Sequence, residues 1–388
     1  MDFLMMANAE SSYAKEMYRA FHKIPEKSRF EIKTNKRIRE ELDKMGVTYL
    51  APKENITIAV IGGKNPGPVV GIRVDTDALQ LTEETNLPYK SEHEGMMHAC
   101  GHDGHIAIGL TCAKILSSMK NDLSGTVKVI FQPAEEGEMG AQEVIATGLV
   151  NDVNAFFSVH LWSPYQTGEM RVAPRGVAAS TDMFTVNIHG RAGHGAMPEV
   201  CIDAVTCASA LVMNLQMIAS RFVSPFAPVV VTVGSVNAGT RCNIIAGEAT
   251  LEGTIRTFDP KVYDEVHSHF DRIVKDTCDA YRCTYEIRNV AACGVTWNDE
   301  KLCGIALENA KKIAPACEVG ADTPFMLGDD FGEYRVIAPV CYMKVGIRNE
   351  EIGAVHAHHH PQFMIDENAL PRAVAWLLMN AESVLNAK

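Results

Sequence analysis

Residues 126–137 read Thr-Val-Lys-Val-Ile-Phe-Gln-Pro-Ala-Glu-Glu-Gly, an apolar run followed by two adjacent carboxylates. The first six residues have the length and β-branched content of a buried strand. Open α/β sheets carry their chemistry at strand ends of this kind. A pair of glutamates alone is more often a solvated surface, but at a strand end we expect Glu135 and Glu136 to form part of a site.

Residues 97–105, Met-His-Ala-Cys-Gly-His-Asp-Gly-His, hold one thiol, three imidazoles and one carboxylate within nine positions. Core packing does not explain so many metal-binding side chains in one short segment. Cys100 and His102 flank Gly101, and a tight glycine bend can direct both side chains at one metal ion. The sequence contains no Cys-x-x-Cys, which argues against a structural zinc ribbon or a thioredoxin-like redox site.

Further ligands come from distant segments. A second apolar strand, predicted over 155–159, leads into His160, and four histidines follow within 356–360. Two neighbouring divalent ions need roughly four to five protein ligands, one of which touches both ions. A thiolate can bridge two ions and an imidazole cannot. We therefore predict Cys100 as the bridge and Glu135 as the proton carrier, with these further ligands: His102, Glu136, His160 and one C-terminal histidine.

The order of strand and helix patterns predicts two domains. Strands and helices alternate up to about residue 160, which is typical of a mostly parallel sheet covered on both faces. From about residue 182 the pattern becomes βαββαβ, with a helix predicted over 203–219, and the α/β pattern resumes after 293. We expect an α/β metallohydrolase domain (1–177 and 293–388) with an inserted α+β lid (178–292). The two joints permit hinging, and an edge strand of the lid sheet offers a dimerisation surface.

Composition and charge indicate which classes of partner and which cellular compartment to expect. The 388-residue chain is 47% hydrophobic and carries a net charge of −12, which argues against binding to nucleic acid or to an anionic membrane surface. An anionic substrate must then be attracted locally, for which Arg256, and less directly Arg191 or Arg241, are candidates. Eleven cysteines without regular pairing, no signal-peptide pattern and no membrane-length apolar run predict a cytoplasmic protein.

The chain resembles a known family over nearly its whole length. The resemblance lies in these segments: 22–34 (His-x-x-Pro-Glu, with Glu31 and Thr34), Arg73-x-Asp75-x-Asp77-Ala78-Leu79, 97–105, 131–137, 159–160, 190–198, 243–245, 253–256 and His359-x-Pro361-x-Phe363. By these motifs it is similar to the aminoacylase and carboxypeptidase superfamily of dinuclear metallopeptidases. Within it, the chain resembles the amidohydrolase branch, which includes N-acyl-L-amino acid amidohydrolases, hippurate hydrolases and auxin-conjugate hydrolases.

The resemblance implies a role for each matched residue. Glu135 would be the general base and acid, and Asp77 would orient a ligand imidazole. His194 and Asn243 match lid residues that reach the substrate carbonyl, the histidine acting across a dimer interface. His359 is favoured among the C-terminal histidines because only it stands two positions before Pro361. The implied ligands of two divalent ions, zinc or manganese with cobalt or nickel as alternatives, are Cys100, His102, Glu136, His160 and His359.

Four positions depart from the family pattern, and none is a predicted ligand. Asp329 stands where relatives usually have Glu, Gln80 and Ala246 replace prolines, and Glu199 replaces a frequent His. These changes alter the reach and charge of the pocket, so they bear on substrate preference.

Three functions are consistent with this reading. The first is hydrolysis of N-acyl-L-amino acids to a carboxylic acid and a free amino acid, by water bridged between the two metal ions. The second is cleavage of unblocked peptides by a dipeptidase or carboxypeptidase, or deacetylation of N-acetyldiaminopimelate. The third, a metal-dependent binding or sensor protein, is disfavoured because Glu135 and all proposed ligands are present.

Overall fold

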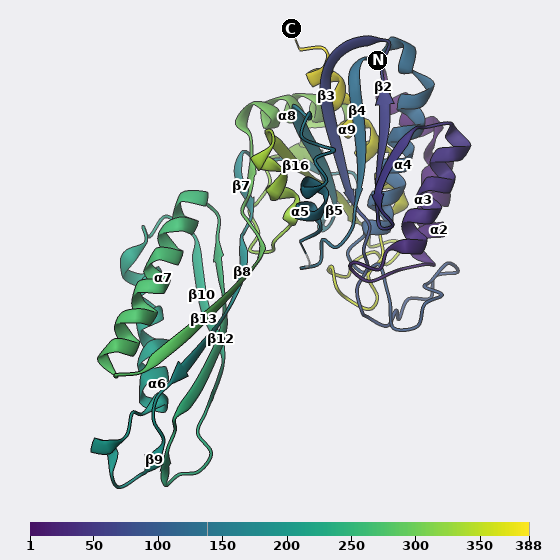
Figure 1. The fold of residues 1–388 in the computed structure, drawn as a ribbon. Helices are drawn as coiled ribbons and strands as arrows, with labels where there is room; N and C mark the ends of the chain where they lie inside the picture. Colours follow the sequence, from purple (N-terminus) through teal and green to yellow (C-terminus); the bar gives the residue numbers. More distant parts are fainter. Residues whose placement is uncertain (138, 388) are drawn as a thin grey trace. The chain divides into compact units, whose positions relative to one another are not determined.

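The computed structural model describes residues 1–137 and 139–387, which form two compact units (Figure 1). Unit 1 comprises Met1–Val177, Trp297–Thr323 and Asp330–Lys388, and unit 2 comprises Ala178–Thr296 and Pro324–Asp329. The predicted domain limits differ from these at two places, because 293–296 and 324–329 belong to unit 2. Cys293 still pairs with Thr181 in the unit 2 sheet, and Phe325 forms a bridge with Ala178.

An eight-stranded sheet forms the centre of unit 1. Its spatial order is β1-β2-β4-β3-β5-β16-β6-β15, and the pairs β4-β3, β3-β5 and β5-β16 at its centre are parallel. Nearer the edges, β1-β2, β2-β4 and β16-β6 are antiparallel. The strands are β1 (Tyr49–Lys53), β2 (Ile56–Gly62), β3 (Asn65–Asp75), β4 (Ser124–Gln132), β5 (Ala155–Gln166), β6 (Met170–Arg171), β15 (Val319–Gly320) and β16 (Val340–Arg348).

Helices cover both faces of this sheet, as expected for a sheet with a parallel, fully buried centre. On one face α4 and α9 pack against the strands and against α2 and α8, while α1 packs on α9. On the other face α5 and η5 (Asp330–Val336) enclose a smaller core that includes Ile130 and Phe156. The helices are α1 (Phe3–Ala9), α2 (Ser11–His22), α3 (Ile32–Met45), α4 (His102–Ser118), α5 (Gly140–Ala146), α8 (Glu300–Ile313) and α9 (Leu370–Leu385).

Local sequence explains where several helices begin and end. Gly101 has φ +85°, a conformation that favours glycine, and α4 begins at the next residue. Gly46 ends α3 in the left-handed conformation, which is the common C-terminal signal. Asp299 caps α8 by accepting the Leu302 N–H at 2.9 Å. Because the glycine bend sets the start of α4, the His102 side chain lies in its first turn.

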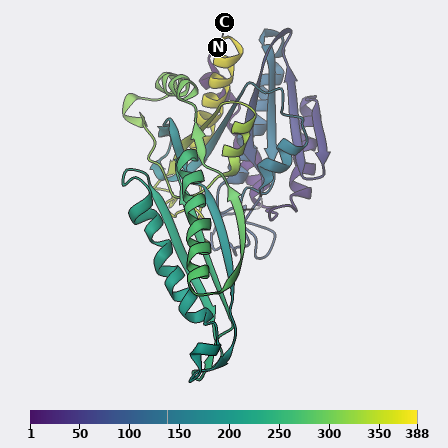
Figure 2. The same ribbon diagram turned by 60° about the vertical axis from the view of Figure 1, so that its left-hand side comes forward.

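Unit 2 is a four-stranded antiparallel sheet in the order β10-β12-β8-β13, with α6 and α7 packed together on one face (Figure 2). The βαββαβ order is as predicted, and the predicted fold class is confirmed. The predicted helix 203–219 divides into α6 and a π-helical segment, η3. The elements are β8 (Thr181–His189), β9 (Gly193–His194), η2 (Pro198–Val200), α6 (Ala204–Leu215), η3 (Ile218–Phe222), β10 (Val229–Ala238), β11 (Ile244–Ile245), β12 (Glu248–Thr257), α7 (Pro260–Ala280) and β13 (Thr284–Cys293).

Short elements escaped the sequence analysis. They include α1, α5 and β1, together with the short strands β7 (Arg175–Ala178) and β14 (Thr296–Asn298), which carry the chain between the units. The remaining short turns are η1 (Lys120–Asp122), η4 (Ala316–Glu318) and η6 (Glu367–Ala369). Too few residues contribute to such elements for a periodic pattern to appear. Within the described ranges, every helix lacks the apolar length that a bilayer crossing requires.

Candidate metal centre

Three of the predicted ligand segments converge near the carboxyl ends of the central parallel strands. β3 pairs in parallel with both β4 and β5, so the ends of these strands lie at one edge of the sheet. The loop after β4 carries Glu135 and Glu136, and α4 begins with His102. The sequence analysis placed His160 at the end of a strand, and this was wrong. His160 lies inside β5, because β5 continues its pairing with β16 beyond this residue.

The five predicted ligands form two groups that share Cys100. One ligand atom from each of Cys100, His102 and His160 lies within 4.8 Å of the others. The same limit holds for the group of Cys100, Glu136 and His359. Two three-ligand groups with a common thiol have the composition of a dinuclear centre with a bridging sulfur. The residues present therefore fit two divalent ions, with zinc among the suitable metals.

Hydrogen bonds orient the two buried imidazoles. His160 Nδ1 lies 2.8 Å from the Leu161 carbonyl oxygen, and His102 Nδ1 lies 3.1 Å from Asp77 Oδ1 and 3.0 Å from the Asp77 carbonyl oxygen. Since these oxygens only accept, each Nδ1 carries the proton in the neutral ring and each Nε2 keeps its lone pair. Among the described residues, the buried His102 Nε2 makes no hydrogen bond. A lone pair buried without a donor is suited to a cation.

Asp77 contacts a predicted ligand imidazole, as the resemblance implied, and it also binds the backbone of Glu136. Its Oδ1 faces His102, while its Oδ2 accepts the Glu136 N–H at 3.0 Å and the Ser28 hydroxyl at 2.7 Å. Burial opposes ionisation of this carboxyl, but the interaction with His102 and the Glu136 N–H lower the pKa of Asp77. One carboxylate thus orients a predicted ligand from each of the two groups.

The geometry separates His359 from its neighbours. His359 Nε2 lies 3.2 Å from Glu136 Oε1, and the His359 N–H donates to the Ala99 carbonyl at 2.8 Å. Both ring nitrogens of His358 are engaged elsewhere, at 3.1 Å from the Ser163 hydroxyl and 2.9 Å from the Leu161 carbonyl. His359 is therefore the C-terminal histidine that the structure brings to Cys100.

Burial and neighbouring groups shift the pKa values of the ligand side chains in different directions. Burial and the neighbouring Glu136 carboxylate raise the pKa of the Cys100 thiol. Hydrogen bonds with Cys100 and Glu136 raise the pKa of His359 to about 10. Burial, together with His105 and His358, holds the pKa of His160 well below its usual value, so this ring is neutral. A thiol of this kind ionises when it binds a metal cation, and a neutral imidazole is the form that coordinates.

A buried network supports the site from behind. His105 Nδ1 lies 2.5 Å from Asp75 Oδ1, and His105 Nε2 accepts the Leu161 N–H at 3.0 Å. Arg73 joins this aspartate to Asp330, at 2.6 Å and 2.8 Å respectively. Both ring nitrogens of His105 are thus engaged in this network, although ligand atoms of Asp75, His102 and His105 also lie within 4.8 Å of one another.

His22 is also held by carboxylates. Its Nδ1 lies 2.6 Å from Asp103 and its Nε2 lies 3.3 Å from Glu83. Burial opposes the charge, but these hydrogen bonds outweigh it and raise the pKa of His22 to about 9. Both ring nitrogens of His22 are therefore engaged by carboxylates.

Several residues that received no role from the sequence hold the loop after β4 by hydrogen bonds. Asp330 Oδ1 accepts from the Gln132 side chain and its Oδ2 accepts the Ala141 N–H, each at 2.8 Å. Glu31 accepts the Ala134 N–H at 2.8 Å. Glu31 belongs to the matched motif segment 22–34, but the motif does not reveal that its side chain contacts this loop.

The predicted lid residues His194 and Asn243 lie in unit 2, on and beside two short paired strands. His194 in β9 pairs with Ile244 in β11, and the Gly195 N–H donates to the Asn243 carbonyl at 2.9 Å. The side chains of His194 and Asn243 are exposed. Arg256 donates to the Thr181 hydroxyl and to the Met326 carbonyl, each at 2.9 Å, so part of its donor capacity serves unit 2 itself. Its role toward a substrate carboxylate, like that of exposed Arg191 and Arg241, stays a prediction.

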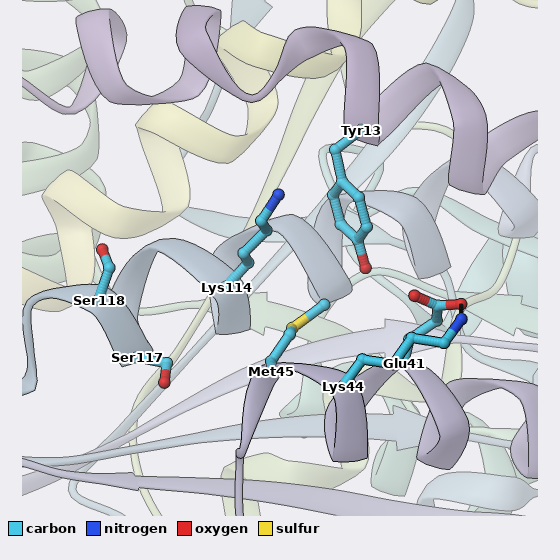
Figure 3. A pocket seen from close by; sticks show the side chains of 7 residues that line it. All are labelled: Tyr13, Glu41, Lys44, Met45, Lys114, Ser117 and Ser118. Carbon is cyan, nitrogen blue, oxygen red and sulfur yellow. Dashed lines mark hydrogen bonds and ion pairs between the residues drawn. The ribbon is translucent and has the colours of Figure 1, made fainter.

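A separate pocket in unit 1 has a different chemistry. It lies among α2, α3 and α4 and is lined by Tyr13, Glu41, Lys44, Met45, Lys114, Ser117 and Ser118 (Figure 3). Its single carboxylate, Glu41, forms ion pairs with Lys44 at 2.8 Å and with Arg37 at 3.3 Å. With neither histidine nor cysteine in its lining, this pocket offers no comparable metal-binding group.

Comparison with known proteins identifies relatives across the chain. The profile of peptidase family M20/M25/M40 matches residues 71–382. An N-acyl-L-amino acid amidohydrolase of Geobacillus stearothermophilus is 40% identical, over 70% of this chain and 74% of the relative. An N-acetylcysteine deacetylase of Bacillus subtilis is 35% identical, over 95% and 96%. Thermostable carboxypeptidase 1 of Saccharolobus solfataricus is 33% identical, over 92% and 91%.

A solved structure supports the same assignment. The crystal structure of a dinuclear metal-binding peptidase of the M20 family from Bacillus subtilis superimposes with a TM-score of 0.85. The two chains are 31% identical, and the match covers 98% of this chain and 100% of the other.

Proposed function

The chain belongs to peptidase family M20/M25/M40 and is a hydrolase of amide bonds, and we propose that its substrates are N-acyl-L-amino acids. Hydrolysis would release a carboxylic acid and a free amino acid. The observation that carries the proposal is the membership of Cys100 in both three-ligand groups. A thiol common to both groups is one arrangement that can bridge a pair of cations.

One divalent ion would be held by His102 and His160 and a second by Glu136 and His359, with Cys100 within reach of both groups. When bound, two divalent cations lower the pKa of a water molecule held between them and stabilise negative charge on the substrate carbonyl oxygen. Asp77 and Leu161 hold the two buried imidazoles with Nε2 directed into the site. These residues need not rearrange before the reaction begins.

Glu135 acts as the base and then as the acid. One ligand atom of Glu135 lies within 4.8 Å of ligand atoms of His102 and Glu136. Its carboxylate takes a proton from the attacking water and delivers it to the leaving nitrogen, because an amide anion is too basic to depart unprotonated. His194 supplies a hydrogen bond to the carbonyl oxygen. Its Nδ1 accepts the Ala196 N–H at 3.1 Å, so the neutral ring carries its proton on Nε2 and can donate.

The decisive experiment measures metal content and turnover together. Purified protein reloaded separately with zinc, manganese, cobalt or nickel is assayed on acetyl, benzoyl and long-chain acyl amino acids. We expect two ions per chain, and we expect Glu135→Gln to lower kcat by about 10²- to 10⁴-fold with both ions retained. Glu10→Gln, at a half-buried ion pair with Lys114 in another part of unit 1, is the matched control. Wild-type turnover in the Glu135 variant would refute the proposed base, and a preparation without bound metal in every reloading would refute the centre.

A second candidate activity rests on the carboxypeptidase relative. A carboxypeptidase or dipeptidase on the same centre would cleave an unblocked dipeptide faster than hippurate, whereas an amidohydrolase would show the reverse order. Assaying N-acetyldiaminopimelate beside these two substrates separates the deacetylase alternative. The substitutions Gln80, Glu199, Asp329 and Ala246 bear on this preference, since they change charge or backbone freedom at family positions.

We propose a homodimer formed through unit 2. The strands β10 and β13 are the edges of its sheet, and Val236 on β10 is 48% exposed. An exposed edge can pair with the same edge of a second copy, and a charged residue there blocks such pairing. Sedimentation at several concentrations should give twice the chain mass, and Val236→Lys should give the monomer. A wild-type monomer at all concentrations would contradict the dimer.

We infer a reducing, cytoplasmic location from the cysteines. All eleven are free thiols, and the closest pairs leave their sulfurs 3.7 Å apart (Cys303 and Cys341) and 3.9 Å apart (Cys207 and Cys278). Proteins of oxidising compartments commonly use such neighbours as disulfides. Thiol titration of unfolded protein, prepared without reductant, should count eleven thiols, and cell fractionation tests the compartment directly.

A further inference from the structure

Glu31 is a fully buried carboxyl outside the candidate metal ligands that reaches the loop bearing Glu135. Its Oε1 accepts the Ala134 N–H at 2.8 Å and the Arg29 N–H at 3.0 Å, and its Oε2 lies 3.5 Å from Asn55 Nδ2. Glu31 also stands at the residue immediately before α3. It therefore connects the start of a helix to the residue that precedes Glu135.

Ala134 is a position that needs such an anchor. Its φ of +56° lies in the left-handed region, which side chains other than glycine rarely adopt, and the residue is fully buried. A buried N–H without an acceptor is costly, so the bond to Glu31 helps to maintain this conformation. The direction in which the chain leaves Ala134 determines where the Glu135 carboxylate points.

The loop is held on both sides of Glu135. Glu31 binds the N–H before it, at Ala134, and Asp77 binds the N–H after it, at Glu136. These two anchors differ in one respect. Asp77 also contacts His102, so its removal disturbs a metal ligand directly, whereas the hydrogen bonds of Glu31 go to Ala134, Arg29 and Asn55.

We propose that Glu31 is a positioning residue for the reaction, which fixes the Glu135 carboxylate through the Ala134 N–H and leaves metal binding to other groups. This inference rests on the proposed role of Glu135 as base and acid. General acid–base catalysis requires the carboxylate to lie within hydrogen-bond reach of the proton that it moves. A displacement of about 1 Å at such a group can lower the rate by about 10²-fold.

Gln is a close substitute for Glu31. Burial, and next the charge of Asp77, raise the pKa of Glu31 to about 8, so the side chain is largely neutral at pH 7. The amide oxygen of a glutamine can accept the same two backbone N–H groups, and an alanine can accept neither. The pair Glu31→Gln and Glu31→Ala therefore separates loss of the hydrogen bonds from loss of the acid group.

The test compares these two variants with Glu26→Ala and Glu135→Gln. Glu26 is the matched control because it accepts the Thr34 N–H at 2.9 Å, and so supports the first turn of the same helix by contacts outside the catalytic loop. For Glu31→Ala we expect kcat to fall by about 10- to 100-fold, with KM and the metal content unchanged. Glu31→Gln should restore kcat to within a few-fold of wild type, and Glu26→Ala should keep it.

Amide hydrogen exchange gives a readout that does not depend on turnover. In chelator-treated protein, the peptide containing Ala134 should exchange faster in Glu31→Ala than in wild type, and should be unchanged in Glu31→Gln and Glu26→Ala. Should Glu31→Ala fail to fold, Glu31→Asp tests the same hydrogen bond, because the shorter side chain places its carboxyl too far from the Ala134 N–H. A folded Glu31→Asp with low kcat and faster exchange supports the proposal.

Several outcomes would overturn the inference. These are wild-type kcat in Glu31→Ala or in a folded Glu31→Asp, equal loss in Glu31→Gln and Glu31→Ala, or the same loss in Glu26→Ala. Loss of bound metal in Glu31→Ala would also overturn it, since Glu31 would then serve the metal ligands. If Glu135→Gln retains full activity, the proposed base is wrong whatever Glu31 does, so the two failures can be told apart.

Discussion

The candidate centre in unit 1 and the His194 region in unit 2 differ in how their side chains are held. His102 and His160 are buried, and each Nδ1 is bound to an oxygen that sets its tautomer. His194 is exposed on a strand of two residues, and Asn243 is exposed in the turn before another such strand. Under the proposed function a metal ligand must keep its geometry before the substrate arrives, whereas the role proposed for His194 requires an accessible side chain. The difference indicates which residues can be removed without loss of the fold.

The largest effect is expected at Cys100. Because it is the residue common to both three-ligand groups, Cys100→Ala should release the pair of ions and abolish turnover. Cys100→Asp keeps a bridging carboxylate and should recover part of the activity. Metal analysis after gel filtration measures this, with exposed Cys317→Ala as the control. Two retained ions in Cys100→Ala would show that the thiol is not the bridge.

A smaller effect is expected at His194. Loss of a hydrogen bond to the developing oxyanion typically lowers kcat by about 10²- to 10³-fold. Because the side chain is exposed, His194→Ala should leave the melting temperature and the metal content unchanged. His189→Ala, at the end of β8 in the same unit, is the control and should retain activity. An unchanged kcat in His194→Ala would remove this residue from the reaction.

A third prediction concerns Asp77, which orients His102 in the candidate metal centre. Asp77→Asn keeps the size of the side chain but loses the charge that faces the His102 Nδ1–H. Changes to groups that orient metal ligands commonly weaken metal binding by about 10- to 100-fold. Competition with a chromogenic chelator should show this weakening in one or both ions. Wild-type affinity would mean that packing alone orients His102.

The smallest effect expected is the contribution of Glu31 to the pH dependence of the free energy of unfolding. The pKa of Glu31 is raised by burial and by Asp77 from 4.5 to about 8, so the folded state holds a proton that the unfolded chain releases near pH 4.5. The stabilisation from this group is complete below about pH 4.5 and is lost as pH rises toward 8. It contributes a slope of at most about 1.4 kcal/mol per pH unit.

Urea unfolding at several pH values, with a chelator present, measures that slope. The free energy of unfolding of Glu31→Gln should fall less steeply between pH 5 and 8 than that of wild type. Identical slopes would mean that Glu31 ionises normally in the folded protein.

The sequence predicted most of the long elements, but not their ends. The apolar run before His160 suggested a strand ending there, whereas β5 extends to Gln166 through its pairing with β16. Local periodicity detects a buried strand but carries no information about how long its partner continues the ladder. The segment 324–329 shows the same limit, because its contacts with unit 2, such as the pairing of Phe325 with Ala178, join residues far apart in the sequence.

By itself the sequence determined the fold class, the insertion of one α+β unit into an α/β unit, and the types of side chain in the candidate centre. Apolar periodicity and the spacing of Cys, His and Glu are local properties, and they can be recognised without coordinates. Only the tertiary structure decided that the Cys100 sulfur lies within 4.8 Å of ligand atoms in both groups, that His358 is engaged elsewhere, and that Glu31 reaches Ala134. These are contacts between distant segments, created when the parallel strands bring their carboxyl ends to one edge of the sheet.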